Sequence, residues 1–256
     1  MDSLPQELIV EIINHLPQRD NISFRYCSLV ARSWRCISQK RLFEFVKPRP
    51  KKLRQLLDGI SQNDGVLLRQ VRSLTCSREK LWAIGPTYDT FCGHFNSLRR
   101  LENFTLCETC LMSSHRGVKR FSAFKHTLSK ITLKGCSVSK SMLVNLINYF
   151  PKLEYLDLMQ ISCVRLLKKT PPIFRLPLKR LYIGEGDTNM LELLDELWKL
   201  GLCTDEVVFP PFLPERSSRA FGNRVVDTFG TSAKCLSLPT NPEGVNQSYY
   251  CGGEPW

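Results

Sequence analysis

Two cysteines in a Cys-x-x-Cys arrangement, Cys107 and Cys110, have the spacing in this chain that best suits a metal ion. A structural zinc site needs four ligands, usually supplied as two close pairs. The nearest further ligands along the chain are Cys92, His94 and His115, which do not form a well-spaced second pair. Cys107 also falls at the end of an expected β-strand. We therefore expect no metal site and no cofactor.

Catalytic side chains do not show a recognisable spacing either. The four histidines are scattered, and the sequence has neither a Gly-x-Gly-x-x-Gly motif nor a phosphate-binding loop that ends in Gly-Lys-Ser or Gly-Lys-Thr. Acidic residues such as Asp187 lack the paired spacing that general acid–base catalysis would need. The sequence therefore predicts a protein that is not an enzyme.

An apolar-x-x-apolar-x-apolar pattern recurs along most of the chain. Strict copies start at Leu101, Leu128, Leu153 and Leu178, and looser copies start at Val71, Thr204 and Ala233. The strict copies are spaced 27, 25 and 25 residues apart. The last two apolar positions of each copy point to the same face of a short strand. One such unit cannot bury its own apolar face, so the pattern predicts a stack of units.

Helical patterns lie between the expected strands. They cover residues 53–60, Met142–Phe150, Asn189–Leu200 and Ser218–Phe229. Proline or glycine follows the last three of these segments directly, as expected at helix ends. The sequence thus predicts an α/β fold in which the stacked strands form one layer and the segments between them form an outer layer with helices.

The outward residues of these strands are the candidates for binding a ligand. They are Asn103, Thr105, Lys130, Thr132, Lys134, Tyr155, Asp157, Arg180 and Tyr182. Tyrosine beside arginine and lysine is typical of recognition surfaces. The three cations favour an acidic or phosphorylated protein segment as the target. The alternative is that these are ordinary solvated strand residues.

The first 40 or so residues have helical patterns, preceded by a capping-box spacing from Ser3 to Gln6. A first helix with a wide apolar face should end at Pro17. A second helix should begin near Asp20, and a third should run from Leu29 to Ile37. Apolar residues expected to face inward or form the first helix's face are Leu8, Ile9, Ile12, Ile13, Leu16, Ile22 and Phe24. So small a core can leave an apolar edge exposed at Leu4, Leu8 and Ile12. The alternative is that these residues pack on the rest of the chain.

These residues carry a family resemblance. Three segments together resemble the F-box: Leu4-Pro5-x-Glu7-Leu8-Ile9-x-Glu11-Ile12-Ile13-x-His15-Leu16-Pro17, then Arg19-Asp20, and then Leu29-Val30-Ala31-Arg32-Ser33-Trp34. The resemblance implies a three-helix module that binds the Skp-type linker protein, and through it the cullin, of cullin–RING (SCF-type) ubiquitin ligases. It makes Leu4, Pro5, Leu8, Ile12 and Leu16 the expected linker contacts, with Val30 and Trp34 as core or rim residues. Ala31 departs from the cysteine that many F-boxes have there.

The recurring strand pattern adds a second resemblance. It is similar to the substrate-binding half of F-box proteins of the leucine-rich-repeat class, with irregular repeats of the kind found in large fungal F-box families. This resemblance implies a solenoid in which short parallel strands line a concave face and helices cover the convex face. Together the two resemblances imply a substrate-recognition adaptor. The implied organisation is an F-box at 1–46, a basic linker and helix at 47–60, a leucine-rich-repeat domain at 61–240 and a tail at 241–256.

Composition is compatible with this and leaves other functions open. The net charge of +12 could attract nucleic acid, so a basic nuclear or nucleic-acid-binding scaffold is an alternative, although nucleic acid is not the expected partner. An F-box protein that acts outside any ligase is another. The basic run at 47–52 is a nuclear localisation signal or a solvated hinge. Without an apolar membrane span or a signal peptide, and with eleven cysteines, we expect the cytosol or nucleus and no membrane partner.

Overall fold

A computed structural model gives the structure of the chain. It describes residues 4–17, 20–47, 68–77, 98–108, 110–111, 121–164, 172, 178–184, 189–209, 235–237 and 248–250. Several sequence predictions lie outside these ranges. They concern Ser3, the helices expected at 53–60 and 218–229, most of the basic run at 47–52, and the residues Cys92, His94 and His115.

Three helices begin the chain, namely α1 (Gln6–His15), α2 (Asn21–Val30) and α3 (Arg32–Glu44). The first helix ends just before Pro17, as predicted. Asp20 caps α2, because its carboxylate accepts hydrogen bonds from the Ser23 backbone N–H and hydroxyl at 3.0 and 2.6 Å. The boundary between α2 and α3 differs from the prediction. Leu29 and Val30 belong to α2, and Ala31 separates the two helices.

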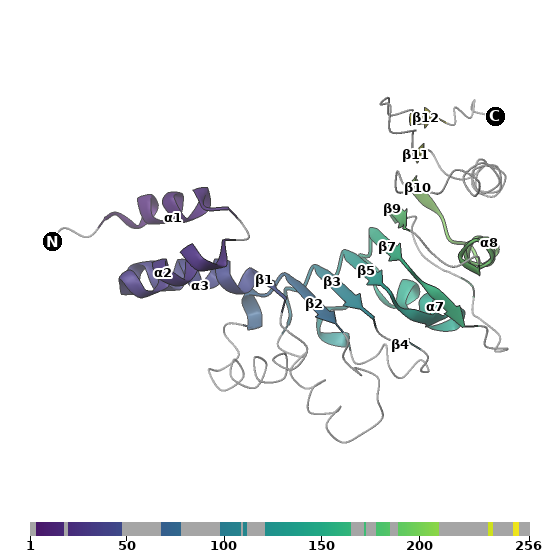
Figure 1. Cartoon of the computed structure of the whole chain (residues 1–256), viewed down its shortest axis with the longest axis horizontal. Helices are drawn as coiled ribbons and strands as arrows, with labels where there is room; N and C mark the ends of the chain where they lie inside the picture. The colour runs from purple at the N-terminus through teal and green to yellow at the C-terminus, as the bar shows by residue number, and fades with distance from the viewer. Residues whose placement is uncertain are drawn as a thin grey trace, which may run out of the picture.

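Strands follow the helices and form two sheets (Figure 1). The large sheet contains β1 (Phe45–Val46), β2 (Ser73–Ser77), β3 (Asn103–Cys107), β5 (Lys130–Lys134), β7 (Tyr155–Met159), β9 (Leu178–Ile183), β10 (Thr204–Val208), β11 (Cys235–Ser237) and β12 (Ser248–Tyr250), in that order. All neighbouring strands pair in parallel except β11 and β12, which are antiparallel. The small parallel sheet contains β4 (Cys110–Leu111), β6 (Ser137–Ser139) and β8 (Ser162–Val164).

Each of the seven copies of the apolar pattern contains one strand of the large sheet. Equivalent positions of neighbouring copies are paired, so that Phe104 lies beside Ile131, and Ile131 beside Leu156. This register follows from burial, since a shift by one residue would turn every apolar side chain to the other face. The predicted strand positions are therefore confirmed. The sequence did not predict the pairing of β12, in the tail, with β11.

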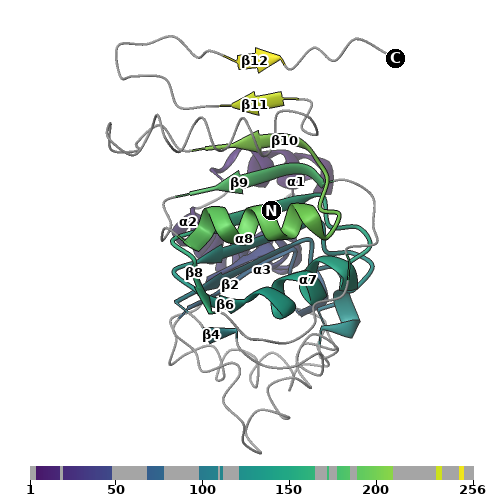
Figure 2. The ribbon, with the colours of Figure 1, turned by 90° about the vertical axis from the view of Figure 1, so that its right-hand side faces the viewer.

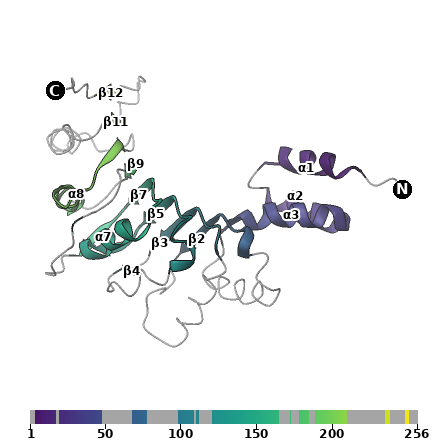
Figure 3. The ribbon, with the colours of Figure 1, turned by 180° about the vertical axis from the view of Figure 1, so that it is seen from behind.

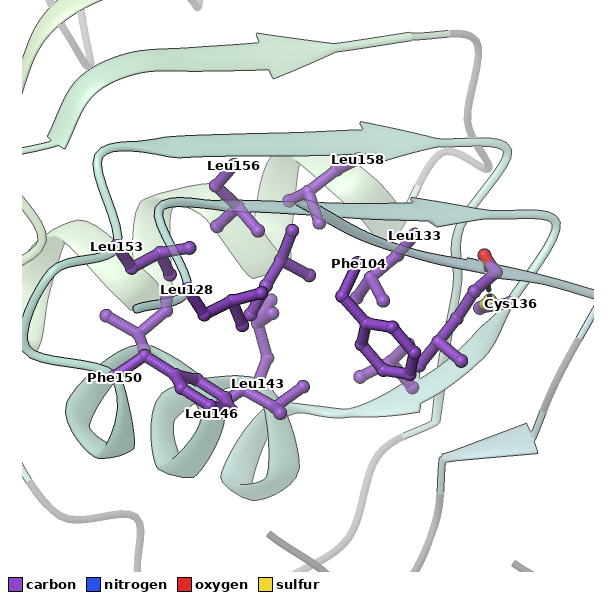
Figure 4. Close-up of a cluster of buried hydrophobic side chains, with 14 of the residues drawn as sticks. Phe104, Leu128, Leu133, Cys136, Leu143, Leu146, Phe150, Leu153, Leu156 and Leu158 are labelled. Carbon is purple, nitrogen blue, oxygen red and sulfur yellow. Dashed lines mark hydrogen bonds between the residues drawn. The ribbon is translucent and has the colours of Figure 1, made fainter. Parts of the chain in front are cut away.

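The core of the large sheet lies between the strands and two helices, α7 (Lys140–Tyr149) and α8 (Asn189–Lys199) (Figure 2). Both helices were predicted to within a residue or two. Figure 4 shows the centre of this sheet core, where Leu133, Leu156 and Leu158 of the strands face Leu143 and Leu146 of α7. The opposite side of the large sheet, turned away from α7 and α8, is called the open face below.

Each of three consecutive strands of the large sheet is followed by a residue with a left-handed backbone conformation, where the chain turns toward the small sheet. Glu108, Gly135 and Gln160 have φ angles of 53°, 61° and 51°. The backbone N–H groups of Glu108 and Gly135 donate to carbonyls of the next strand, at 2.7 and 2.8 Å. Only one of these three positions has the glycine that this conformation favours.

Candidate functional site

Helix α1 divides its apolar residues between two faces. Ile9 and Ile13 are fully buried and form, with Phe24 of α2, the core of the three-helix unit, called the helical core below. Leu4, Leu8 and Ile12 are between 41% and 46% exposed. Leu8 and Ile12 are four residues apart on one side of α1, and Leu4 precedes the helix; the three are called the α1 stripe below. Pro5 occupies the N-cap position of α1 and is also exposed. Leu16 is half-buried against the helical core.

Helix α2 presents a second apolar face that the sequence analysis did not identify. Ile22, Tyr26, Leu29 and Val30 have helical spacing and are 66% to 75% exposed. The prediction that Ile22 points inward is therefore wrong. Of the two places expected for Val30, core or rim, its exposure rules out the core. Phe24 is the buried residue of α2, and the other side chains of this helix are half-buried or exposed. Trp34 is half-buried and packs against the helical core.

The two apolar faces differ in the charged residues that accompany them. Between Asp20 and Glu44 the sequence has five basic residues and no acidic one; the basic residues are Arg25, Arg32, Arg35, Lys40 and Arg41. Helix α1, in contrast, has Glu7 and Glu11 and no lysine or arginine. Two of the basic residues lie beside the α2 face: Arg25 belongs to α2, and Arg35 donates from its Nε atom to the Ser28 carbonyl of α2 at 3.4 Å. The α2 face is therefore an apolar surface with a basic border.

The open face of the large sheet brings the predicted strand residues into aligned rows. Asn103, Lys130, Tyr155 and Arg180 are neighbours in one row, and Thr105, Thr132, Asp157 and Tyr182 are neighbours in the next. Lys134 is exposed at the end of β5, while most of the other residues are half-buried. The structure thus brings together all nine residues that the sequence analysis selected.

Asp157 does not fit the prediction that it is offered to solvent, because it is only 7% exposed. Its Oδ2 atom lies 2.5 Å from Lys130 Nζ and accepts a hydrogen bond from the Thr132 hydroxyl at 3.1 Å. Its Oδ1 atom is buried without a hydrogen-bond donor among the described residues. One of the three cations predicted to attract an acidic target is therefore already paired within the protein.

Arg180 has a different environment from Lys130. Its guanidinium carbon lies 5.5 Å from the centre of the Tyr155 ring, within the range of a cation–π contact. Its Nε atom is buried and has no hydrogen-bond acceptor among the described residues. No described carboxylate forms an ion pair with Arg180. Of the three cations selected from the sequence, Arg180 and the exposed Lys134 are therefore the two that the open face offers to a ligand.

The reactive groups of the described residues do not form a catalytic or metal site. Burial raises the pKa of the Cys107 thiol, and this effect exceeds the opposing one of Lys134 and Lys47. Cys107 therefore stays protonated near neutral pH and is a weak nucleophile. No three histidine, cysteine or acidic side chains in the described ranges come together as metal ligands. Nor does any described helix have the length and apolar character needed to cross a membrane.

Comparison with known proteins agrees with the N-terminal part of this description. Residues 1–45 match the model of the F-box domain. The match includes α1, α2 and α3 and supports an F-box protein, a class whose members typically act as non-catalytic adaptors and whose F-box generally binds a Skp-type linker. No curated protein matches the chain.

Proposed function

We propose that this F-box protein is the substrate-recognition adaptor of an SCF-type ubiquitin ligase, working in the cytosol or nucleus. In this proposal the three-helix unit binds the Skp-type linker, and the open face of the large sheet binds a target protein. Leu4, Leu8 and Ile12 carry the proposal, since an exposed apolar stripe on a matched F-box domain is a surface suited to a protein partner.

The α2 face belongs to the same proposed linker surface. Leu29 and Val30 are more exposed than any residue of the α1 stripe, and unpartnered apolar side chains of this size favour association. The basic border predicts that the linker contributes carboxylates at the rim of the contact. Such rim charges would speed association more than they would add affinity.

We further propose that the strands form a leucine-rich-repeat solenoid, with the F-box at 1–46, a connection at 47–60, repeats at 61–240 and a tail at 241–256. Two observations support this. All seven pattern copies contain a strand, and consecutive copies pair in parallel in sequence order. In such a solenoid the open face is the surface available to a target, with Arg180, Lys134, Tyr155 and Tyr182 as its contacts.

The direct test of linker binding is affinity measurement between the purified chain and a Skp-type linker. Leu8→Ala removes an exposed side chain from the α1 stripe, and Leu29→Ala does so on the α2 face. Val10→Ala is the matched control, because Val10 is an exposed residue of the same helix about 200° away from the stripe. Interface anchors cost more than about 1 kcal/mol on truncation, or roughly fivefold or more in Kd.

We expect each test variant to weaken binding to this extent and the control to bind like the unmodified chain. Absence of binding by the unmodified chain would overturn the proposal, and so would equal binding by all variants. Reconstituted ubiquitin transfer, with the cullin and RING subunits added, then separates a ligase adaptor from an F-box protein that acts outside a ligase.

A further inference from the structure

Helix α3 contributes to two cores at once. Trp34, Ile37 and Leu42 pack against the helical core, while Phe43 packs against the sheet core. Leu42 and Phe43 are neighbours, so consecutive residues of one helix point into different cores. Figure 3 shows α3 ending beside the first strands of the large sheet. The helix is thus a structural part of both units.

The chain enters the large sheet directly where α3 ends. Phe45 and Val46 form β1, which pairs in parallel with Ser73 and Leu74 of β2. The Arg72 backbone N–H donates to the Glu44 carbonyl at 3.0 Å. The junction between the two units therefore precedes residue 47, and its backbone is already held by the hydrogen bonds of a sheet.

The Glu44 side chain connects the groups around this junction. One carboxylate oxygen lies 3.0 Å from Arg41 Nη1, and the other lies 3.6 Å from Arg72 Nε. The second guanidinium nitrogen of Arg41 donates to the side-chain oxygen of Asn14 in α1. The carboxylate is thereby linked to α1 through Arg41 and to the sheet through Arg72. Its side chain is only 12% exposed, so solvent screens these contacts less than it would at the surface.

The side chains around Glu44 leave a small space unfilled. A cavity of about 80 Å³ lies here, lined by side chains of α1, α2, α3 and β1, including Leu16, Phe24, Glu44 and Phe45. The helical core holds α1 against α2 and α3, and next to this space a polar contact, from Arg41 to Asn14, also joins α1 to the sheet end of α3. Asn14, Arg41 and Glu44 all line this space, so the chain of contacts from Glu44 through Arg41 to Asn14 lies along its wall.

We propose that Glu44 is a positioning residue that holds the three-helix unit and the large sheet in one fixed relative orientation. The consequence for activity rests on the proposed function. A ligase adaptor accelerates ubiquitin transfer by holding the target near the transferring subunits, and proximity of this kind requires a constant distance between its two binding surfaces. Glu44 would set that distance without contacting either partner.

The test is a distance measurement on the full chain with no partner present. Eleven cysteines make thiol labelling unselective, so an azide-bearing amino acid is introduced genetically at two exposed positions, Glu11 in α1 and Lys152 after α7. Spin labels are attached there, and pulsed electron paramagnetic resonance gives the distribution of distances between them. We expect one narrow peak for the otherwise unmodified chain.

Four substitutions are compared in the labelled chain. Glu44→Ala removes the carboxylate, Glu44→Gln keeps an oxygen that can accept from Arg41, and Arg72→Ala removes the partner on the sheet side. Glu154→Ala is the control, because Glu154 has an ion pair with Lys179 at 2.9 Å on the large sheet, away from the junction. Circular dichroism confirms that each variant is folded before its distances are measured.

We expect Glu44→Ala and Arg72→Ala to lose the narrow peak, Glu44→Gln to retain more of it, and Glu154→Ala to match the unmodified chain. A broad distribution in the unmodified chain would overturn the proposal. A narrow peak that persists in both Glu44→Ala and Arg72→Ala would also overturn it. Because no linker or target is used, failure of the adaptor proposal would leave this result unaffected, and the linker affinity of Glu44→Ala can be compared separately.

Discussion

Replacing Lys130 by methionine should destabilise the protein through the carboxylate that it leaves behind. Methionine keeps the length and apolar stem of lysine but removes its charge. Asp157 would then keep one hydrogen bond, from the Thr132 hydroxyl at 3.1 Å, while its Oδ1 atom remains buried without a donor. A buried charge that loses its partner is costly because burial has already removed its hydration.

The size of the effect follows from how far each partner is buried. Breaking a fully buried pair costs about 3–5 kcal/mol, and a fully exposed pair contributes about 0–1 kcal/mol. The side chains of Lys130 and Asp157 are 31% and 10% exposed, which places this pair between those limits. We therefore expect Lys130→Met to lower the free energy of unfolding by about 1–3 kcal/mol. For a domain of this size that is a fall in Tm of roughly 2–12 °C.

A double-mutant cycle measures the interaction itself. Asp157→Asn removes the charge but keeps an oxygen that can accept from Thr132, so in that background Lys130→Met should cost much less. Urea unfolding followed by tryptophan fluorescence gives the four free energies, and we expect a coupling energy of about 1–2 kcal/mol. If Lys130→Met costs the same with and without the Asp157 carboxylate, the pair is a solvated surface contact. Lys130 would then be free to bind an acidic target.

Two further predictions concern local backbone conformation. Hydrogen bonds from the Ser23 hydroxyl and then the Ser23 N–H lower the pKa of Asp20, so its contribution to stability is present at neutral pH and is lost as the pH falls below about 4. The Tm of Asp20→Ala should thus be below that of the unmodified chain at pH 7, and the gap should narrow as the pH is lowered below about 4. A gap that stays the same as the pH falls would contradict this. At the left-handed positions, Gly135→Ala should cost about 1 kcal/mol, whereas Gln160→Gly should stabilise by up to about 1 kcal/mol, as measured by urea unfolding. A loss of stability in Gln160→Gly would show that backbone strain at φ 51° is not the controlling factor.

Local periodicity was sufficient to predict most of the secondary structure. The alternation in Leu128–Leu133 and its copies specifies a half-buried strand because side chains on a strand alternate between two faces. The helix of Asn189–Lys199 was predictable for a similar reason, since its apolar residues repeat with the helical period and Gly201 ends it with a φ of 96°. Both signals depend only on residues close together in the chain.

The candidate site was predictable as a set of residues but not in its interactions. The strand register identifies Lys130, Asp157 and Arg180 as residues of one face. Their different roles depend on contacts between strands, because Lys130 reaches Asp157 across 27 positions of the sequence, while Arg180 stacks on Tyr155. The spacing of residues in the sequence does not show that Lys130 forms an ion pair whereas Arg180 lies over a tyrosine ring.

The sequence by itself determined an F-box-like start and seven strands at a nearly regular spacing, and it identified Leu4, Leu8 and Ile12 as candidates for an apolar edge. Each of these follows from a repeat or motif within a short segment. The tertiary structure alone decided that Val30 is exposed, that Asp157 is buried, and that α3 contributes to both cores around Glu44. Exposure depends on which neighbouring elements cover a side chain, and a junction is defined by two units that meet. Both are properties of the assembled chain, so they could not be obtained from local pattern.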